Sequence, residues 1–159
     1  MESDWFWTTI VKGYIAPWKS GSDDQNRTVL RAYASSAAVL ASGGYGLVLE
    51  GIIGPWFLPD VLGEIRARGV DAHYAVLRPS LEVALDRASA RANDDRVFGN
   101  RHLADRHLTD PEPVRFMWER FSDLGEYERF VIDNTHLTVE ETVQIVLERL
   151  HSGALRLGI

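Results

Sequence analysis

The stretch Gly46–Pro59, GLVLEGIIGPWFLP, decides the fold that we predict, because an apolar run ends there on one acid, Glu50, and breaks into a glycine turn. A short apolar run of this kind is typical of a buried parallel strand, which we predict over Leu47–Ile53. Ligands of open α/β sheets collect at the carboxyl ends of such strands, so Glu50 is a candidate site residue. The alternative for a lone acid at this point is a solvated strand terminus.

Strand and helix patterns alternate along the rest of the chain. Further strands are predicted over Ala72–Leu77 and Arg129–Ile132. Helical spacing of apolar residues predicts helices over 25–42, 59–68, 81–92, 114–124 and 138–150. The last of these begins with a capping-box pattern, Thr138 with Glu141. This alternation predicts an α/β fold with right-handed parallel crossovers and about three strands, in a single domain over residues 1–159.

Two segments depart from the alternating pattern. The first 22 residues are aromatic, are interrupted by glycine and proline, and contain no predicted strand. Residues 93–113, NDDRVFGNRHLADRHLTDPEP, are polar and rich in arginine and histidine, and we predict a lid-like flap there.

The composition limits the possible classes of protein. A chain of 159 residues with 45% hydrophobic and 25% charged residues is typical of one globular domain with a sizeable core. The formal net charge of -6 argues against non-specific binding to a nucleic acid polymer. No apolar run approaches the roughly 18 residues of a membrane span, so no membrane partner is expected. The absence of cysteine and of an export signal makes the cytoplasm the expected compartment.

Several segments taken together resemble the small-molecule kinase branch of the P-loop nucleoside triphosphatases, the group that includes chloramphenicol phosphotransferase-like and zeta-toxin-like ATP-binding proteins. The matching segments are ESDWFW at 2–7, GYIAPW at 13–18 with QNRTVL at 25–30, GGYGLVLEGIIGPWFLP at 43–59, HYAVLRPSLEVALDRASAR at 73–91, LTDPEPVRFMWERF at 108–121 and VIDNTHLTVEETV at 131–143. The resemblance implies a three-layer parallel sheet of P-loop kinase type. It also implies ATP and Mg²⁺ as cofactors and phosphoryl transfer to a hydroxyl of a small-molecule acceptor.

One element of that family is missing from the sequence. The resemblance implies a first strand and a GxxxxGK loop before ESDWFW, which would supply the backbone cradle and the lysine for the phosphates. The only lysines, Lys12 and Lys19, do not lie in a glycine-rich turn between a strand and a helix. The predicted sheet is therefore incomplete, and a gene start placed too far downstream, a truncation and a degenerate relative all remain open.

The resemblance implies roles for two acids. Asp4 matches the family acid that orients or deprotonates the acceptor hydroxyl, or holds the metal through water. Glu50 matches the acid that supports Mg²⁺ and its waters, although the family often has aspartate there. The alternative for Asp4 is a frayed acid near the N-terminus.

The resemblance also implies a catalytic role for two arginines on the helix that leads into the flap. Arg87 and Arg91 are four residues apart, so they share one helix face, and in such kinases they stabilise the charge that develops on the transferred phosphoryl group. The alternative is a solvated helix face on which Glu82 and Asp86 are the partners.

The remaining candidates concern the two substrates. The substrate-binding candidates are Trp5, Trp7, Arg27, Gly51 and Trp56. Aromatic walls are typical of small-molecule sites, but Trp5 and Trp7 are also suited to packing the first helix onto the sheet. Asp133 and Thr135 lie where the resemblance puts the adenine, and their alternative is turn chemistry with helix capping.

A second reading of the function remains open. Without its phosphate loop the chain is also compatible with a non-catalytic nucleotide-binding relative, or with a scaffold that self-associates. An unpaired sheet edge between the strands that end at Glu50 and Arg78 would recruit another strand and give a homo-oligomer, unless the two strands pair directly.

Overall fold

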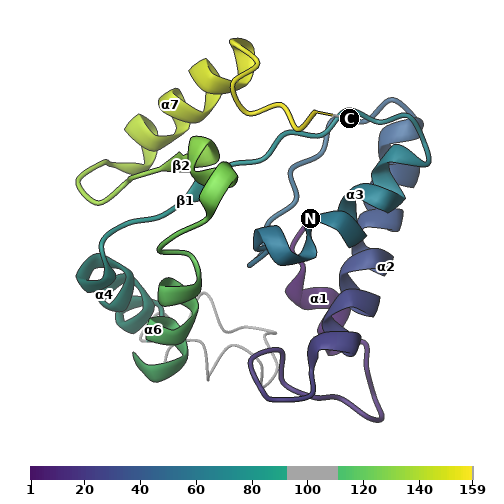
Figure 1. Ribbon diagram of the computed structural model, residues 1–159, viewed down its shortest axis with the longest axis horizontal. Coiled ribbons are helices and arrows are strands. Elements are labelled where there is room, and N and C mark those ends of the chain that lie inside the picture. Colours follow the sequence, from purple (N-terminus) through teal and green to yellow (C-terminus); the bar gives the residue numbers. More distant parts are fainter. Residues whose placement is uncertain (93–110, 159) are drawn as a thin grey trace. The chain divides into compact units, whose positions relative to one another are not determined.

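The computed structural model describes residues 1–92 and 111–158. The chain divides into two compact units, Met1–Ala72 and His73–Gly158, which are drawn with their elements in Figure 1. Each unit is described by itself below.

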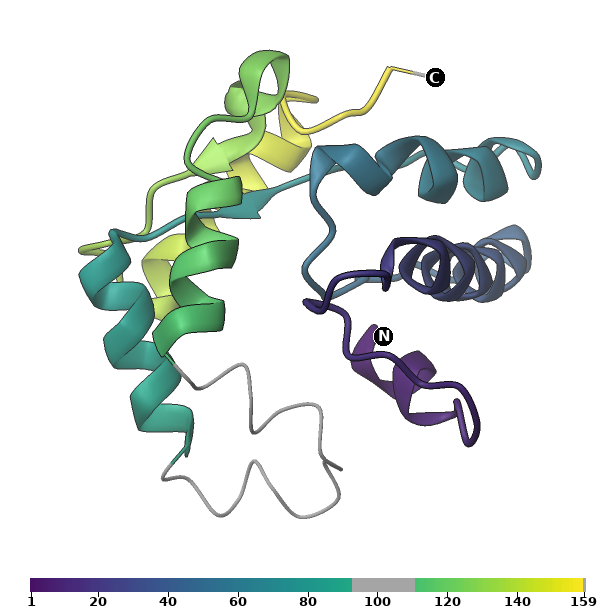
Figure 2. The same ribbon diagram turned by 60° about the horizontal axis from the view of Figure 1, so that its bottom comes forward.

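Unit 1, Met1–Ala72, is helical. It contains α1 (Asp4–Thr8), α2 (Asp23–Ser42), a 3₁₀ turn η1 (Pro55–Phe57) and α3 (Leu58–Arg66). Helices α2 and α3 lie side by side in both Figure 1 and Figure 2. Two acids occupy the first turn of α2, where the helix dipole favours negative charge, and the helix ends at the Gly43–Gly44 pair.

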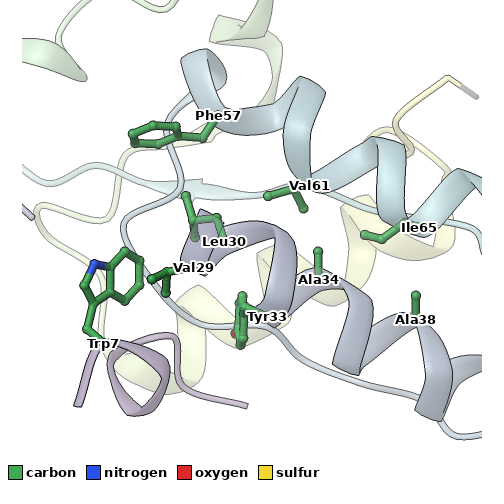
Figure 3. Close-up of a cluster of buried hydrophobic side chains, with 9 residues drawn as sticks. All are labelled: Trp7, Val29, Leu30, Tyr33, Ala34, Ala38, Phe57, Val61 and Ile65. Atoms are coloured by element: carbon green, nitrogen blue, oxygen red, sulfur yellow. The ribbon is translucent and has the colours of Figure 1, made fainter. Parts of the chain in front are cut away.

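A buried apolar cluster holds these helices together (Figure 3). Tyr33 and Ala34 of α2 are completely buried, and Leu30 is 1% exposed. The cluster consists of Trp7, Val29, Leu30, Tyr33, Ala34, Ala38, Phe57, Val61 and Ile65. The members come from three helices and η1, and most of them lie on α2. The apolar face of α2 therefore forms the centre of the cluster against which the other elements pack.

Unit 2, His73–Gly158, combines helices with a small parallel sheet. Strand β1 (Val76–Leu77) pairs with β2 (Val131–Ile132), with Val76 opposite Val131 and Leu77 opposite Ile132. The helices are α4 (Leu81–Ala92), α6 (Pro111–Arg120), the 3₁₀ segment η2 (Gly125–Phe130) and α7 (Val139–His151). Helices α4 and α6 lie against each other.

Two predictions made from local sequence patterns in unit 2, a helix range and a capping box, are confirmed. Helix α4 covers the predicted range 81–92. Helix α7 begins with the predicted capping box, in which the Glu141 N–H donates to Thr138 Oγ1 at 3.1 Å and the Thr138 N–H donates to the Glu141 carboxylate at 2.8 Å. These bonds satisfy two backbone donors that would otherwise lack partners at a helix start.

The sheet is smaller than predicted. The helices and the two parallel strands confirm a mixed α/β character, but the described residues contain two strands and not three. The prediction of a strand over Leu47–Ile53 is wrong: this segment makes one isolated parallel bridge, Glu50 with Glu2. A strand requires a longer ladder, and among the described residues only the first few of the chain pair with this segment. Helix α1 was not predicted.

Two further predictions, of the flap and of no membrane-spanning helix, can be compared only with the residues that the structure describes. The predicted flap lies outside them except for its last three residues, 111–113, which begin α6. Among the residues that the structure describes, no helix combines the length and the apolar character that crossing a membrane requires.

Candidate functional site

Glu50 and the start of the chain form the first candidate site. The Glu50 N–H donates to the Met1 carbonyl at 2.8 Å, and the Ser3 N–H donates to the Glu50 carbonyl at 2.9 Å. These bonds run the two segments side by side in the same direction, with Glu2 beside Glu50. Asp4, the first residue of α1, follows directly. The pairing therefore brings together the segments of both acids that the sequence singles out.

Tyr33 lies beneath this pairing. Its hydroxyl group donates toward the carbonyls of Met1, at 2.6 Å, and of Glu50, at 3.1 Å. Burial raises the pKa of Tyr33 to about 12, and the negative charges of Glu50, Asp4 and Glu2 act in the same direction. One phenol on α2 thus fixes the backbone of both segments and lies within electrostatic range of three carboxylates.

The Glu50 side chain is exposed, and its carboxylate has no hydrogen bond or ion pair with any residue in the described part of the chain. Asp4 is half-buried, and the Ser3 hydroxyl lies 3.4 Å from its carboxylate. Within the described ranges 1–92 and 111–158, no three histidine, aspartate or glutamate side chains are grouped as a protein-only metal site would require. One or two carboxylates with water and phosphate oxygens are instead the usual surroundings of Mg²⁺, and Glu50 fits that kind of site.

Gly51 and Arg27 are engaged within unit 1. A Cβ atom at Gly51 would lie 2.8 Å from the Ser3 Cβ, so glycine is needed there for the close approach of the two paired segments. Arg27 forms an ion pair with Asp60 of α3, and its guanidinium lies 5.6 Å from the centre of the Phe57 ring. Both residues therefore have structural roles beside any contact with a substrate.

The predicted aromatic wall does not form a single surface. Trp7 is 7% exposed and belongs to the core, where its indole N–H donates to the Asn26 side chain at 3.2 Å. Trp5 is 56% exposed. Trp56 is half-buried and meets Phe57 edge to face. The structure thus separates a core tryptophan from an exposed one.

The second group of candidates lies in unit 2, at the carboxyl ends of β1 and β2. The Thr135 backbone N–H and hydroxyl both donate to the Asp133 carboxylate, and these bonds are the main reason that the pKa of Asp133 is lowered. The Ser80 N–H donates to the Thr135 hydroxyl at 2.8 Å. This chain of bonds joins the ends of both strands, and it is the turn chemistry named as the alternative for these residues.

Arg87 of α4 reaches the same loop. Its guanidinium donates to the Asn134 carbonyl at 3.0 Å. Arg91 lies one turn further along α4, and its side chain is outside the described residues. The segments that carry Asp4 and Glu50 therefore lie side by side in unit 1, and Arg87, Asp133 and Thr135 belong to one loop network in unit 2.

Three further residues contribute to these groups: Tyr33, and Arg78 and Asn134, which the sequence places at predicted strand ends that could face a ligand but to which it assigns no role. Tyr33 was predicted only as part of an apolar helix face. Arg78 binds both carboxylate oxygens of Glu128, at 2.8 and 2.9 Å, and its place at a predicted strand end was the available signal. Asn134 is 7% exposed, and its side-chain oxygen has no hydrogen-bond partner in the described part of the chain.

Comparison with models of protein families gives no match for this chain, and comparison with curated proteins gives no significant one.

Proposed function

We propose that this chain belongs to an ATP-dependent phosphotransferase that acts on a hydroxyl group of a small molecule. The observation that carries the proposal is the parallel pairing of Glu2 with Glu50, because it brings the segments of Asp4 and Glu50 side by side. Phosphoryl transfer demands mainly positioning and charge, and acids on two adjoining segments suit the tasks of holding an acceptor hydroxyl and a hydrated Mg²⁺.

Each candidate then has a separate task. Asp4 accepts the proton of the acceptor hydroxyl or orients that group. Glu50, whose carboxylate is unengaged, holds waters of Mg²⁺, and the ion when bound neutralises phosphate charge. For unit 2 the proposal rests on the sequence resemblance alone, which assigns the positive charge for the transferred group to Arg87 and Arg91 and the base of the nucleotide to Asp133 and Thr135.

A phosphate-binding loop is the element that this proposal needs and that the 159 residues do not contain. Both lysines, Lys12 and Lys19, are exposed and lie outside any turn between a strand and a helix. The second candidate function is a nucleotide-binding or self-associating scaffold. The unengaged Glu50 carboxylate favours the phosphotransferase as the first choice.

Calorimetric titration with Mg-ATP tests the first proposal. We expect saturable binding, weakened about threefold to tenfold by Glu50→Gln, since this variant removes the charge that supports the metal-bound nucleotide. Asp4→Asn should leave Mg-ATP binding within about twofold of the wild type, since Asp4 is assigned to the acceptor hydroxyl. Glu126→Gln is the matched control, because Glu126 is an exposed glutamate of unit 2 outside the candidate groups, and it should bind as the wild type does.

The outcome that contradicts the phosphotransferase is an absence of binding at millimolar Mg-ATP. In that case light scattering distinguishes the scaffold, which predicts a dimer or a larger assembly, from a monomer that supports neither function. Equal weakening by Glu126→Gln would show that the effect of Glu50→Gln is a general effect of net charge.

A further inference from the structure

A cavity of about 350 Å³ opens on unit 1, between α1 with the residues that follow it and the first half of α2. Its size falls at the lower end of the roughly 300–1,000 Å³ of ligand pockets, which suits a ligand with one ring. The lining residues are Phe6, Thr9, Ile10, Asp24, Gln25, Thr28, Val29 and Ala32. It is a different place from the pairing of Glu2 with Glu50.

One part of the lining is apolar and fixed by the core. Val29 is 6% exposed and belongs to the buried cluster, while Phe6 and Ile10 pack against that cluster. The Phe6 ring meets Tyr33 edge to face, with ring centres 5.2 Å apart. These contacts hold the apolar wall in place before any ligand arrives, which lowers the free-energy cost of binding.

Most polar groups of the lining are already engaged by the chain itself. The Thr9 hydroxyl donates to the Phe6 carbonyl at 2.7 Å, and the Thr28 hydroxyl donates to the Asp24 carbonyl at 2.8 Å. The Gln25 amide binds the Ile15 backbone N–H and carbonyl. The Asp24 carboxylate, in contrast, has no hydrogen bond or ion pair with a described residue.

The cavity therefore offers an apolar wall and one exposed carboxylate without a side-chain partner, and none of its described lining residues is cationic. We propose that it binds a small primary amine, whose ammonium group pairs with the Asp24 carboxylate and whose ring or short alkyl body lies on Phe6 and Val29. A neutral ligand of the same shape keeps the apolar contacts and loses the charge-assisted hydrogen bond. The site goes beyond the proposed phosphotransferase and requires no nucleotide.

Titration of the full chain with 2-phenylethylamine, followed by two-dimensional amide NMR without nucleotide, tests the site. We expect saturable shifts centred on residues 6–10 and 24–32, and binding weaker by about fivefold or more for the uncharged analogue 2-phenylethanol. Asp24→Asn should reduce the affinity for the amine to that for the alcohol.

Asp23→Asn is the matched control, because Asp23 lies beside Asp24 in the first turn of α2, carries the same charge and does not line the cavity. It should change the affinity for the amine less than twofold. Ala32→Leu adds volume inside the cavity and should abolish binding of both ligands, with an otherwise unchanged amide spectrum as proof of folding.

Three results would overturn the proposal. The first is an absence of saturable shifts at millimolar amine, and the second is equal binding of amine and alcohol by the wild type. The third is equal weakening by Asp23→Asn and Asp24→Asn, which would mean that the amine responds to the general negative charge of the helix start.

Discussion

The two units are stabilised in different ways. In unit 1, a buried apolar cluster joins α1, α2, η1 and α3, and Tyr33 at its centre is completely buried. In unit 2, arginines bind backbone carbonyls: Arg78 donates to Phe121 at 2.6 Å and to Ser122 at 3.2 Å, and Arg149 donates to Val131 at 2.8 Å. Unit 2 also buries apolar side chains such as Phe130 and Leu155. What distinguishes it is that charged hydrogen bonds from arginines to the backbone are added to this apolar burial.

This difference also bears on the candidate groups of residues. Where an apolar cluster holds the fold, a polar group such as the Glu50 carboxylate can stay unengaged at the surface. Where polar side chains hold the fold, candidate residues such as Thr135 and Arg87 already have internal partners. The Glu50 carboxylate is therefore better placed for a ligand than the polar residues of unit 2.

The largest effect is expected from Leu30→Ala in the core of unit 1. Leu30 is 1% exposed, so its truncation leaves a cavity and lowers the free energy of unfolding by about 3 kcal/mol. Urea denaturation measures the change, and hydrogen exchange should locate it in α2 and α3. Leu40→Ala on the same helix is the control, because Leu40 is 43% exposed, and it should cost less than about 1 kcal/mol. Similar losses in both variants would contradict an apolar origin of the stability of unit 1.

A somewhat smaller effect is expected from Arg78→Met in unit 2. The variant leaves two carbonyls and the Glu128 carboxylate without their donor, which should cost about 2 kcal/mol. Hydrogen exchange should increase over residues 121–132. Arg115→Met on α6 removes an exposed arginine and serves as the control. If hydrogen exchange over these residues were unchanged in Arg78→Met, the hydrogen bonds of Arg78 would not stabilise unit 2 as proposed.

Alkaline pH should act on unit 1 through Tyr33. Because its pKa in the folded protein is about 12, above the ordinary value of 10.0, the folded state holds the proton more tightly than the unfolded state does. The resulting stability is fully present below pH 10 and is lost as the pH rises through about 12, by up to about 1.4 kcal/mol per pH unit. Urea denaturation of the wild type and of Tyr33→Phe at several pH values checks this. Burial also raises the pKa of Tyr74, but this contribution is common to both proteins. Parallel pH dependence of the two proteins would therefore contradict the role of Tyr33.

The smallest effect is expected from Thr138→Ala at the start of α7. Loss of the capping bond should lower the free energy of unfolding by about 1 kcal/mol. Thr138→Ser keeps the hydroxyl group and should keep most of the stability that the bond contributes. Thermal denaturation followed by circular dichroism compares the two variants. If serine were as harmful as alanine, the capping bond would not be the cause.

The sequence predicts what depends on neighbouring residues. The α4 range and the Thr138 capping box follow from spacings of three and four residues, and both are confirmed. The strand over 47–53 fails because a strand depends on partners far along the chain. Two other contacts also join residues far apart in the chain: the ion pair of Arg27 with Asp60, and the hydrogen bond from the Tyr33 hydroxyl to Met1. In the sequence alone, Arg27 looks like any exposed arginine, and Tyr33 looks like any residue of an apolar helix face.

The most direct test of the proposed function is amide NMR with Mn²⁺ in place of Mg²⁺, since the paramagnetic ion broadens signals of nearby residues. With ATP present, we expect broadening centred on residues 2–4 and 49–51, lost in Glu50→Gln and retained in Glu126→Gln. Broadening that ignores ATP, or that centres on another part of the chain, would contradict the assignment of Glu50 to a metal-bound nucleotide.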